Sequence, residues 1–160
     1  MQKVTILCVG KLKERFYVDA AAEYEKRLSR FCKLEIAELA EARLSETPSP
    51  AEIEQALLEE ASRVESKLPK FGVLIALCIE GTELSSPALA EALNRFAVFG
   101  ASQLTFLIGG SVGLHPSLKA RADLRLSMSP MTFPHHLARV MLLEQIYRAY
   151  QIQAGSRYHK

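Results

Sequence analysis

The sequence predicts an α/β domain whose sheet is largely parallel. Short apolar runs that suit buried strands alternate along the chain with segments that suit helices, in a strand–helix order repeated five times. Continuous apolar strands of this kind are typical of parallel sheets covered by helices on both faces. The 160 residues show no internal repeat and no break in composition. We therefore expect residues 1–160 to form one domain.

In the amino-terminal half, apolar runs predict strands and helix-forming residues predict helices. The first run ends at Gly10, as a buried strand would end at a turn. Phe16, Ala20 and Tyr24 then recur at four-residue steps, which indicates a helix. Pro50, followed by acidic residues, marks another helix start. The expected elements are strands at residues 4–9 and 34–39, helices at 14–30 and 50–67, and a loop at 45–50.

The carboxyl-terminal half continues the alternation. Ser86 and Pro87 suit the N-cap and first turn of a helix that Gly100 would end. Pro134 opens the last helix, and Gly155 would end it. The expected elements are strands at residues 71–79, 103–108 and 124–128, and helices at 86–99, 116–123 and 134–152.

The bulk composition excludes several classes of protein. No apolar stretch approaches the roughly 20 residues that span a bilayer, so no membrane association is expected. Cys8, Cys32 and Cys78 have no metal-ligand or disulfide spacing, so we expect no metal and a reducing, cytoplasmic setting. A net charge of +2 is too small for a protein that coats nucleic acid without specificity. Any RNA contact should therefore be local.

Three loops are expected at the carboxyl ends of strands, where α/β sheets bind ligands. They are residues 80–82, 109–114 and 129–133. The spacing Gly109-Gly110-x-x-Gly113 does not match a dinucleotide fingerprint, and no Gly-Lys-Ser/Thr exists for a Walker loop. A tight turn without a ligand remains an alternative for the glycines. Residues 126–134 alternate apolar and hydroxyl side chains between prolines, which suits either a purine-binding segment or a plain strand end.

Polar groups near the last helix are candidates for chemistry. His135 and Arg139 are four residues apart and share a helix face near its start. The imidazole can accept a proton, and the guanidinium favours an oxyanion or a phosphate. Tyr158, His159 and Lys160 place a phenol, an imidazole and an ammonium at the chain end. A solvated helix face and a frayed tail remain the plainer interpretations.

Taken together, these motifs resemble the RlmH family of the SPOUT (α/β-knot) superfamily. The residues that match are Leu107 to Gly110, Leu126 to His135, Arg139, Glu144 to Ala149, and Tyr158 to Lys160. The resemblance implies a trefoil-knotted α/β domain that works as a homodimer. It also implies transfer of a methyl group from S-adenosylmethionine to N3 of a pseudouridine in 23S rRNA, on assembled ribosomes.

The resemblance also implies which residues do the work. Catalytic residues beside the target base would be His135, Arg139, Tyr158 and His159. Cofactor contacts would come from Leu77, Gly109, Met128, Ser129, Pro130, Met131, Thr132 and Phe133. The chain departs from the family pattern at Cys78, Thr82 and Ser111-Val112, which affects side chains of two of the loops.

The expected chemistry leaves two alternatives open. Methylation of an imide nitrogen needs its proton removed, so we expect Arg139 and the tail to favour the anion while His135 or His159 accepts the proton. The sequence does not choose between the two histidines. The alternative functions are a noncatalytic ribosome-associated factor of the same fold and an α/β enzyme acting on a free nucleotide.

Overall fold

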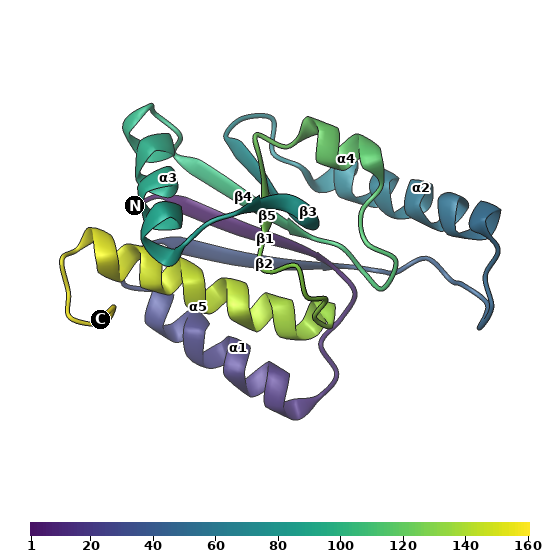
Figure 1. Ribbon diagram of the computed structural model, residues 1–160, viewed down its shortest axis with the longest axis horizontal. Coiled ribbons are helices and arrows are strands. Elements are labelled where there is room, and N and C mark those ends of the chain that lie inside the picture. The colour runs from purple at the N-terminus through teal and green to yellow at the C-terminus, as the bar shows by residue number, and fades with distance from the viewer.

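A five-stranded sheet forms the centre of the computed structural model, which describes all of residues 1–160. Its order is β2-β1-β4-β3-β5, and every neighbouring pair is parallel. This confirms the predicted parallel α/β fold (Figure 1). The strands are β1 (Lys3–Val9), β2 (Lys33–Leu39), β3 (Val73–Glu83), β4 (Gln103–Ile108) and β5 (Leu124–Ser127).

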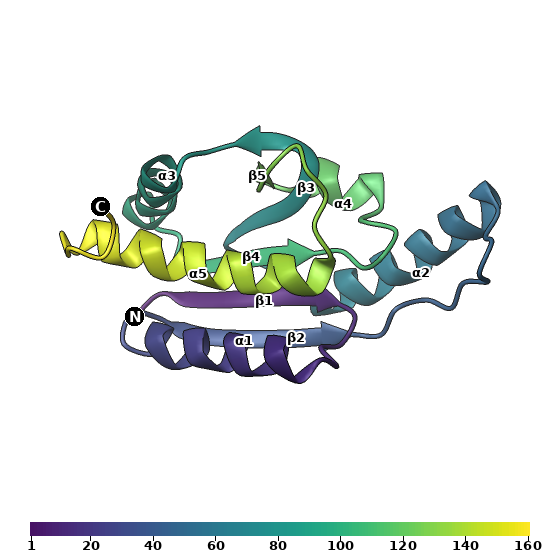
Figure 2. The same ribbon diagram turned by 60° about the horizontal axis from the view of Figure 1, so that its bottom comes forward.

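Helices cover both faces of the sheet, as the continuous apolar strands require. Alternate residues of β1 enter two separate cores: Ile6 packs with α1, α3 and α5, whereas Leu7 packs with α2 and α4. Figure 2 shows α2 and α4 together, at the opposite side of the molecule from the carboxyl terminus. The helices are α1 (Arg15–Leu28), α2 (Pro50–Lys67), α3 (Ser86–Val98), α4 (Pro116–Arg121) and α5 (His135–Gln153).

Capping side chains fix where the helices begin. Ser49 accepts a hydrogen bond from Glu52 N while the Glu52 carboxylate accepts one from Ser49 N, a reciprocal capping box at the start of α2. The predicted bounds 50–67 are confirmed for this helix. At α3 the predicted cap was wrong by one residue, because Ser85 rather than Ser86 accepts from Ala88 N.

The predicted loop at residues 80–82 was wrong, because β3 continues through it to Glu83. Both Leu77 and Thr82 lie opposite Leu126 of β5, so the residues between them form a bulge. A Cβ on Gly81 would lie 2.7 Å from the carbonyl oxygen of Arg125, so only glycine allows this close approach. The apolar run that predicted this strand ends at Ile79, which lies inside the bulge.

The sheet topology defines where a ligand can enter. β1 and β4 are neighbours, but the chain leaves β1 toward β2 and leaves β4 toward β5 on the other side. Connections that diverge in this way open a crevice beyond the carboxyl ends of the strands. The loops after β1, β2 and β4 meet the start of α5 at this crevice (Figure 1).

Candidate functional site

A cavity of about 770 Å³ lies at the carboxyl edge of the sheet. It lies between β3, the loop after β4 and the segment joining β5 to α5. Seven of the eight residues predicted to contact a cofactor line it, Pro130 being the exception. The seven are Leu77, Gly109, Met128, Ser129, Met131, Thr132 and Phe133. His135 also lines this cavity, so the structure brings the predicted cofactor segment and one predicted base together.

The glycine loop after β4 is a tight turn that forms one wall of the cavity. Gly113 N donates to Gly110 O at 3.1 Å, and Gly113 has a φ of 83° that favours glycine. A Cβ on Gly109 would lie 2.5 Å from the carbonyl oxygen of Gly113. The turn therefore needs its glycines for its own closure, and its position makes it part of the ligand site as well.

The segment between β5 and α5 leaves backbone donors free. Ser129 Oγ accepts from Met131 N at 2.9 Å, and Ser127 Oγ donates to Ser129 O at 3.2 Å. The N–H groups of Thr132 and Phe133 donate to no group of the chain. Unpaired amides beside apolar side chains suit a ligand that has both a flat apolar ring and hydrogen-bond acceptors at its edge.

His135 is the first residue of α5 and lies over the turn after β1. A Cβ on Gly10 would be 2.9 Å from His135 Cε1, so glycine makes room for the ring. Burial, followed by the charge of neighbouring His136, lowers the pKa of His135 below its ordinary 6.5, while Glu41 opposes this shift. The imidazole is therefore mostly neutral near pH 7 and able to accept a proton.

Glu41, which the sequence did not single out, joins two parts of this site. One of its carboxylate oxygens lies 3.8 Å from His135 Nε2 and accepts from Ser111 N at 3.1 Å. Glu41 thus contacts both the glycine turn and the candidate base. In the sequence it is one acidic residue among many after a strand, and only the fold brings it to His135.

Arg139 lies one helical turn below His135 and is 3 % exposed. Its guanidinium donates to Glu38 Oε2 at 2.8 Å and to Gly10 O at 3.2 Å. Burial alone would raise the pKa of Glu38, but the hydrogen bonds from Arg139 and Leu12 N lower it below 4.5. Arg139 does not line the cavity. In the isolated chain it connects the turn after β1 and the end of strand β2 to α5.

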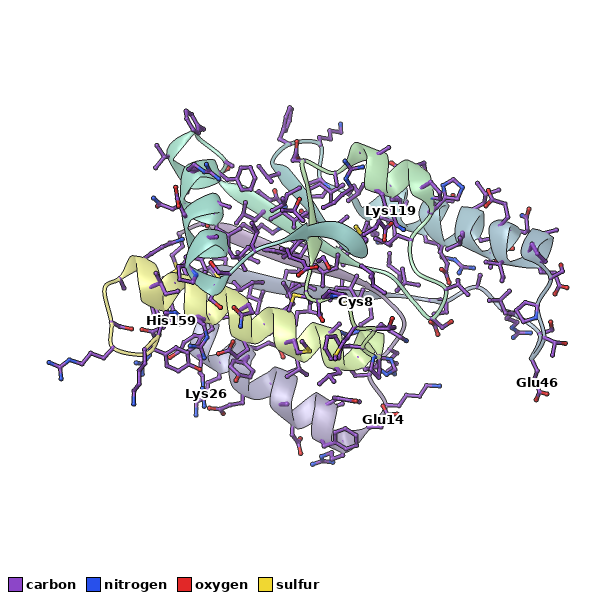
Figure 3. The ribbon with its side chains drawn as sticks, in the orientation of Figure 1. Cys8, Glu14, Lys26, Glu46, Lys119 and His159 are labelled. Carbon is purple, nitrogen blue, oxygen red and sulfur yellow. The ribbon has the colours of Figure 1, made fainter.

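The tail residues Tyr158 and His159 pack against the far half of α5. Tyr158 donates to Glu144 Oε1 at 3.1 Å, and His159 Nδ1 lies 3.1 Å from Arg148 Nη1. Arg148 is thirteen residues beyond His135, which is about 20 Å along a helix. Figure 3 shows His159 well apart from Lys119, which lines the cavity. The structure does not bring the tail to the cavity of the same chain.

Three further observations concern metal ligands, membrane-spanning helices and cysteines. No group of three or more His, Cys, Asp or Glu side chains is arranged to hold a metal ion. No helix is both long and apolar enough to cross a membrane. The three cysteines are free thiols, and burial raises the pKa of Cys8 to about 12 and that of Cys32 to about 11.

Comparisons with known proteins support the fold and identify the family of the chain. The model of a family described as predicted SPOUT methyltransferase matches residues 2–159. A solved structure of a probable methylase family protein from Haemophilus influenzae Rd KW20 aligns with a TM-score of 0.51 at 13% identity, covering 98% of this chain and 70% of that one. The chain belongs to the SPOUT methyltransferase family.

Curated relatives narrow the family further. A ribosomal RNA large subunit methyltransferase H from Streptococcus equi subsp. zooepidemicus is 48% identical over 158 residues, which is 99% of both chains. The protein of that name from Bifidobacterium adolescentis is also 48% identical over 99% of both chains. The one from Leuconostoc mesenteroides is 44% identical over 98% of this chain and 99% of its own. The resemblance to the RlmH family seen in the sequence is confirmed.

Proposed function

We propose that this protein transfers a methyl group from S-adenosylmethionine to N3 of a pseudouridine in 23S rRNA of the assembled ribosome. The observation that carries the proposal is the cavity, which unites the predicted cofactor segment with His135. The family and the names of the curated relatives support methyl transfer to large-subunit rRNA. A ribosomal substrate would place the protein in the cytoplasm.

The cavity fits S-adenosylmethionine in size and in chemistry. Its volume of about 770 Å³ lies within the range of small-molecule sites. Apolar side chains of Leu77, Met128 and Phe133 offer surfaces for a purine, and the free N–H groups of Thr132 and Phe133 offer donors. When bound, the cofactor supplies an electrophilic methyl group on its sulfonium. The protein holds that group and brings the target nitrogen to it.

His135 is the better placed of the two candidate bases within one chain. It lines the cavity, and its lowered pKa keeps it neutral at pH 7. In the proposed reaction it would accept the N3 proton of the pseudouridine imide, which leaves the nitrogen able to take the methyl group that bound S-adenosylmethionine would supply, with S-adenosylhomocysteine as the other product. Glu41 favours the imidazolium that forms, because its carboxylate lies 3.8 Å from Nε2.

The tail points to a homodimer. If Tyr158 and His159 act on the target base, a second copy must supply them, because they lie about 20 Å along α5 from the cavity rim of their own chain. Every side chain of α5 through Ile152 is at least partly covered, so this helix has no fully solvated face. We therefore place α5 at the interface between two copies, with each tail beside the other copy's cavity.

Methyl transfer to ribosomes tests the proposal directly. Ribosomes from a strain that lacks the protein are incubated with tritiated S-adenosylmethionine, with free rRNA alongside, and the labelled nucleoside is identified by mass spectrometry. We expect N3-methylpseudouridine on ribosomes and little on free rRNA. Absence of label, when S-adenosylhomocysteine but not NAD or ATP raises the unfolding temperature, would contradict the assigned RNA target but not the cofactor.

A further inference from the structure

A second charged surface lies at the opposite edge of the sheet from the cavity. Residues 1–3, 29–33, 67–72 and 98–103 precede β1, β2, β3 and β4, and we call them the amino-end surface. The strand register places Lys3 beside both Lys33 and Gln103, and Val73 beside Leu104. The four segments therefore form one continuous edge of the parallel sheet.

The amino-end surface concentrates the positive charge of the chain. It contains five of the 20 basic residues and none of the 18 acidic ones, so the rest of the chain is net negative. All five are exposed. Only Lys3 forms an ion pair, with Glu35 at 3.1 Å. The other four, free of any ion pair, are Arg30, Lys33, Lys67 and Lys70.

The remaining turn, before β5, carries one carboxylate and one cation, and the cation is paired. Asp123 accepts from Leu74 N at 2.8 Å, so its carboxylate is engaged with the backbone of β3. Arg121 pairs with Glu65. The last turns of α1 and α3, which lead into the amino-end surface, add the basic side chains of Lys26, Arg27 and Arg95.

Two phenylalanines stand in solvent among these cations. Phe71 is 86% exposed and Phe99 is 87% exposed, more than any other aromatic residue of the chain. Their turns adjoin, since a Cβ on Gly72 would lie 2.5 Å from the carbonyl oxygen of Gln103. Neither ring contributes to the cores of the domain. Exposed rings beside unpaired cations are typical of surfaces that bind single-stranded nucleic acid, because phosphates meet the cations and bases stack on the rings.

We propose that the amino-end surface binds an unpaired stretch of RNA, with phosphates on Lys67, Lys70 and Lys33 and bases on Phe71 and Phe99. A strand the length of β1, seven residues, separates this edge from the cavity by about 23 Å. The bound stretch is therefore distinct from the nucleotides presented to the cavity. That it belongs to ribosomal RNA rests on the proposed function, whereas the affinity for RNA does not.

Binding of a fluorescein-labelled oligouridine, followed by anisotropy over a range of salt, tests the surface. The double variant Lys67→Gln/Lys70→Gln should lower the slope of log affinity against log salt by about 1.4, the value for two single-strand phosphates. The variant Phe71→Ala/Phe99→Ala should weaken binding at least about thirtyfold, since each stacked base is worth about 1 kcal/mol or more, with an unchanged slope. The control Arg43→Gln/Arg125→Gln removes two exposed cations that form no ion pair and lie outside this surface, and it should have a smaller effect. An equal effect of the control, or no effect of either test variant, would overturn the proposal.

Cross-linking identifies what the surface meets on the ribosome. Benzoylphenylalanine replaces Phe71 in the full chain, and the complex with ribosomes is irradiated and digested. A cross-link to rRNA supports the proposal. Cross-linking to a ribosomal protein or to a second copy of the chain, or no cross-link to RNA, overturns it.

Methyl-transfer kinetics separate this inference from the proposed function. Phe71→Ala/Phe99→Ala should keep the wild-type kcat and raise KM for ribosomes, since the surface is remote from the cavity. If the wild-type protein transferred no methyl group but still bound oligouridine through these rings, the proposed function would be contradicted and the RNA-binding surface would not. Unfolding midpoints of the variants should match the wild type, because the replaced side chains are exposed.

Discussion

At the scale of single residues, Glu41 connects parts of the site that are far apart in the chain. Its carboxylate meets Ser111 N of the glycine turn and lies near His135 at the start of α5. A negative charge at this position has two effects. It accepts a hydrogen bond from the turn, and it favours the protonated form of His135, which the proposed proton transfer would produce.

Replacement of Glu41 by Gln should lower kcat for methyl transfer by about tenfold, less than the roughly 10²- to 10⁴-fold contribution of a general base, because His135 itself remains in place. Because Glu41 raises the pKa of His135, the acid limb of the pH–rate profile should also move to lower pH. Initial rates between pH 5 and 8 measure both effects. The matched control is Glu54→Gln, which removes a carboxylate 3.1 Å from His115, a histidine that does not line the cavity. An unchanged profile in Glu41→Gln would remove Glu41 from the mechanism.

Some residues of the candidate site could be predicted from the sequence, and others could not. The segment from Met128 to Phe133 was predicted to contact the cofactor because its contiguous residues match a family motif, although their types alone also suited a plain strand end. Glu41 was not, because it reaches Ser111 across 70 residues and nothing local marks it. Arg139 was predicted beside the substrate from its residue type, but its burial beneath His135 depends on the fold.

At the scale of elements, the start of α5 is held by a single ion pair to β2. Arg139 and Glu38 connect the helix that carries His135 to the strand whose loop carries Glu41. The pair also anchors the turn at Gly10, over which His135 lies. Its loss should therefore disturb both stability and the placement of the base.

Glu38→Gln should destabilise the protein by about 1 to 2 kcal/mol near neutral pH, as expected for a charge-assisted hydrogen bond at a partly exposed site. The folded-state pKa of Glu38 is below 4.5, so the stabilisation is present above that pH and is lost as pH falls through the folded value. Urea unfolding at pH 7 and in increasingly acid buffers measures the difference from wild type. A difference that stayed constant into acid would contradict the assigned ion pair.

Gly109→Ala should prevent the glycine turn from closing, since the new Cβ would lie 2.5 Å from Gly113 O. We expect affinity for S-adenosylhomocysteine to fall at least about tenfold, which calorimetric titration measures. Gly113→Ala is the control, because its Cβ would meet open space and the cost is only the strain of a positive φ. Equal losses in both variants would show that the turn's shape, and not the clash, governs binding.

Elements with local signals were the most predictable. Pro50 and the acidic residues after it placed α2 to the residue, because the start of a helix depends on a few neighbouring positions. The end of β3 was missed because the bulge between Leu77 and Thr82 depends on pairing with β5, which is distant in sequence. The start of α2 could therefore be predicted from neighbouring residues, whereas the end of β3 depends on its pairing with β5.

At the scale of the whole molecule, the tail and the cavity of one chain lie apart. We therefore expect a dimer in which each tail lies beside the cavity of the other copy. His135→Ala and a chain ending at Arg157 should each be inactive alone. Mixed after partial unfolding and refolding, they should regain about a quarter of wild-type activity, since half the dimers carry one intact site in a twofold assembly. Refolding each variant separately is the control. If light scattering showed dimers in the mixture but no activity returned, the tail of one copy would not complete the site of the other.

The order of the strands has a consequence for how the chain is made. β1 is synthesised first, yet its partner β4 begins only at Gln103. At about 5 to 20 residues per second, β1 waits some 5 to 20 s with one of its edges unpaired. An unpaired apolar edge invites pairing with other chains. The helix α5, which completes the core with Leu142, Leu143 and Ile146, arrives later still. The yield of this protein in a cell should therefore depend on translation speed, and slower translation of residues 40–103 should increase aggregation.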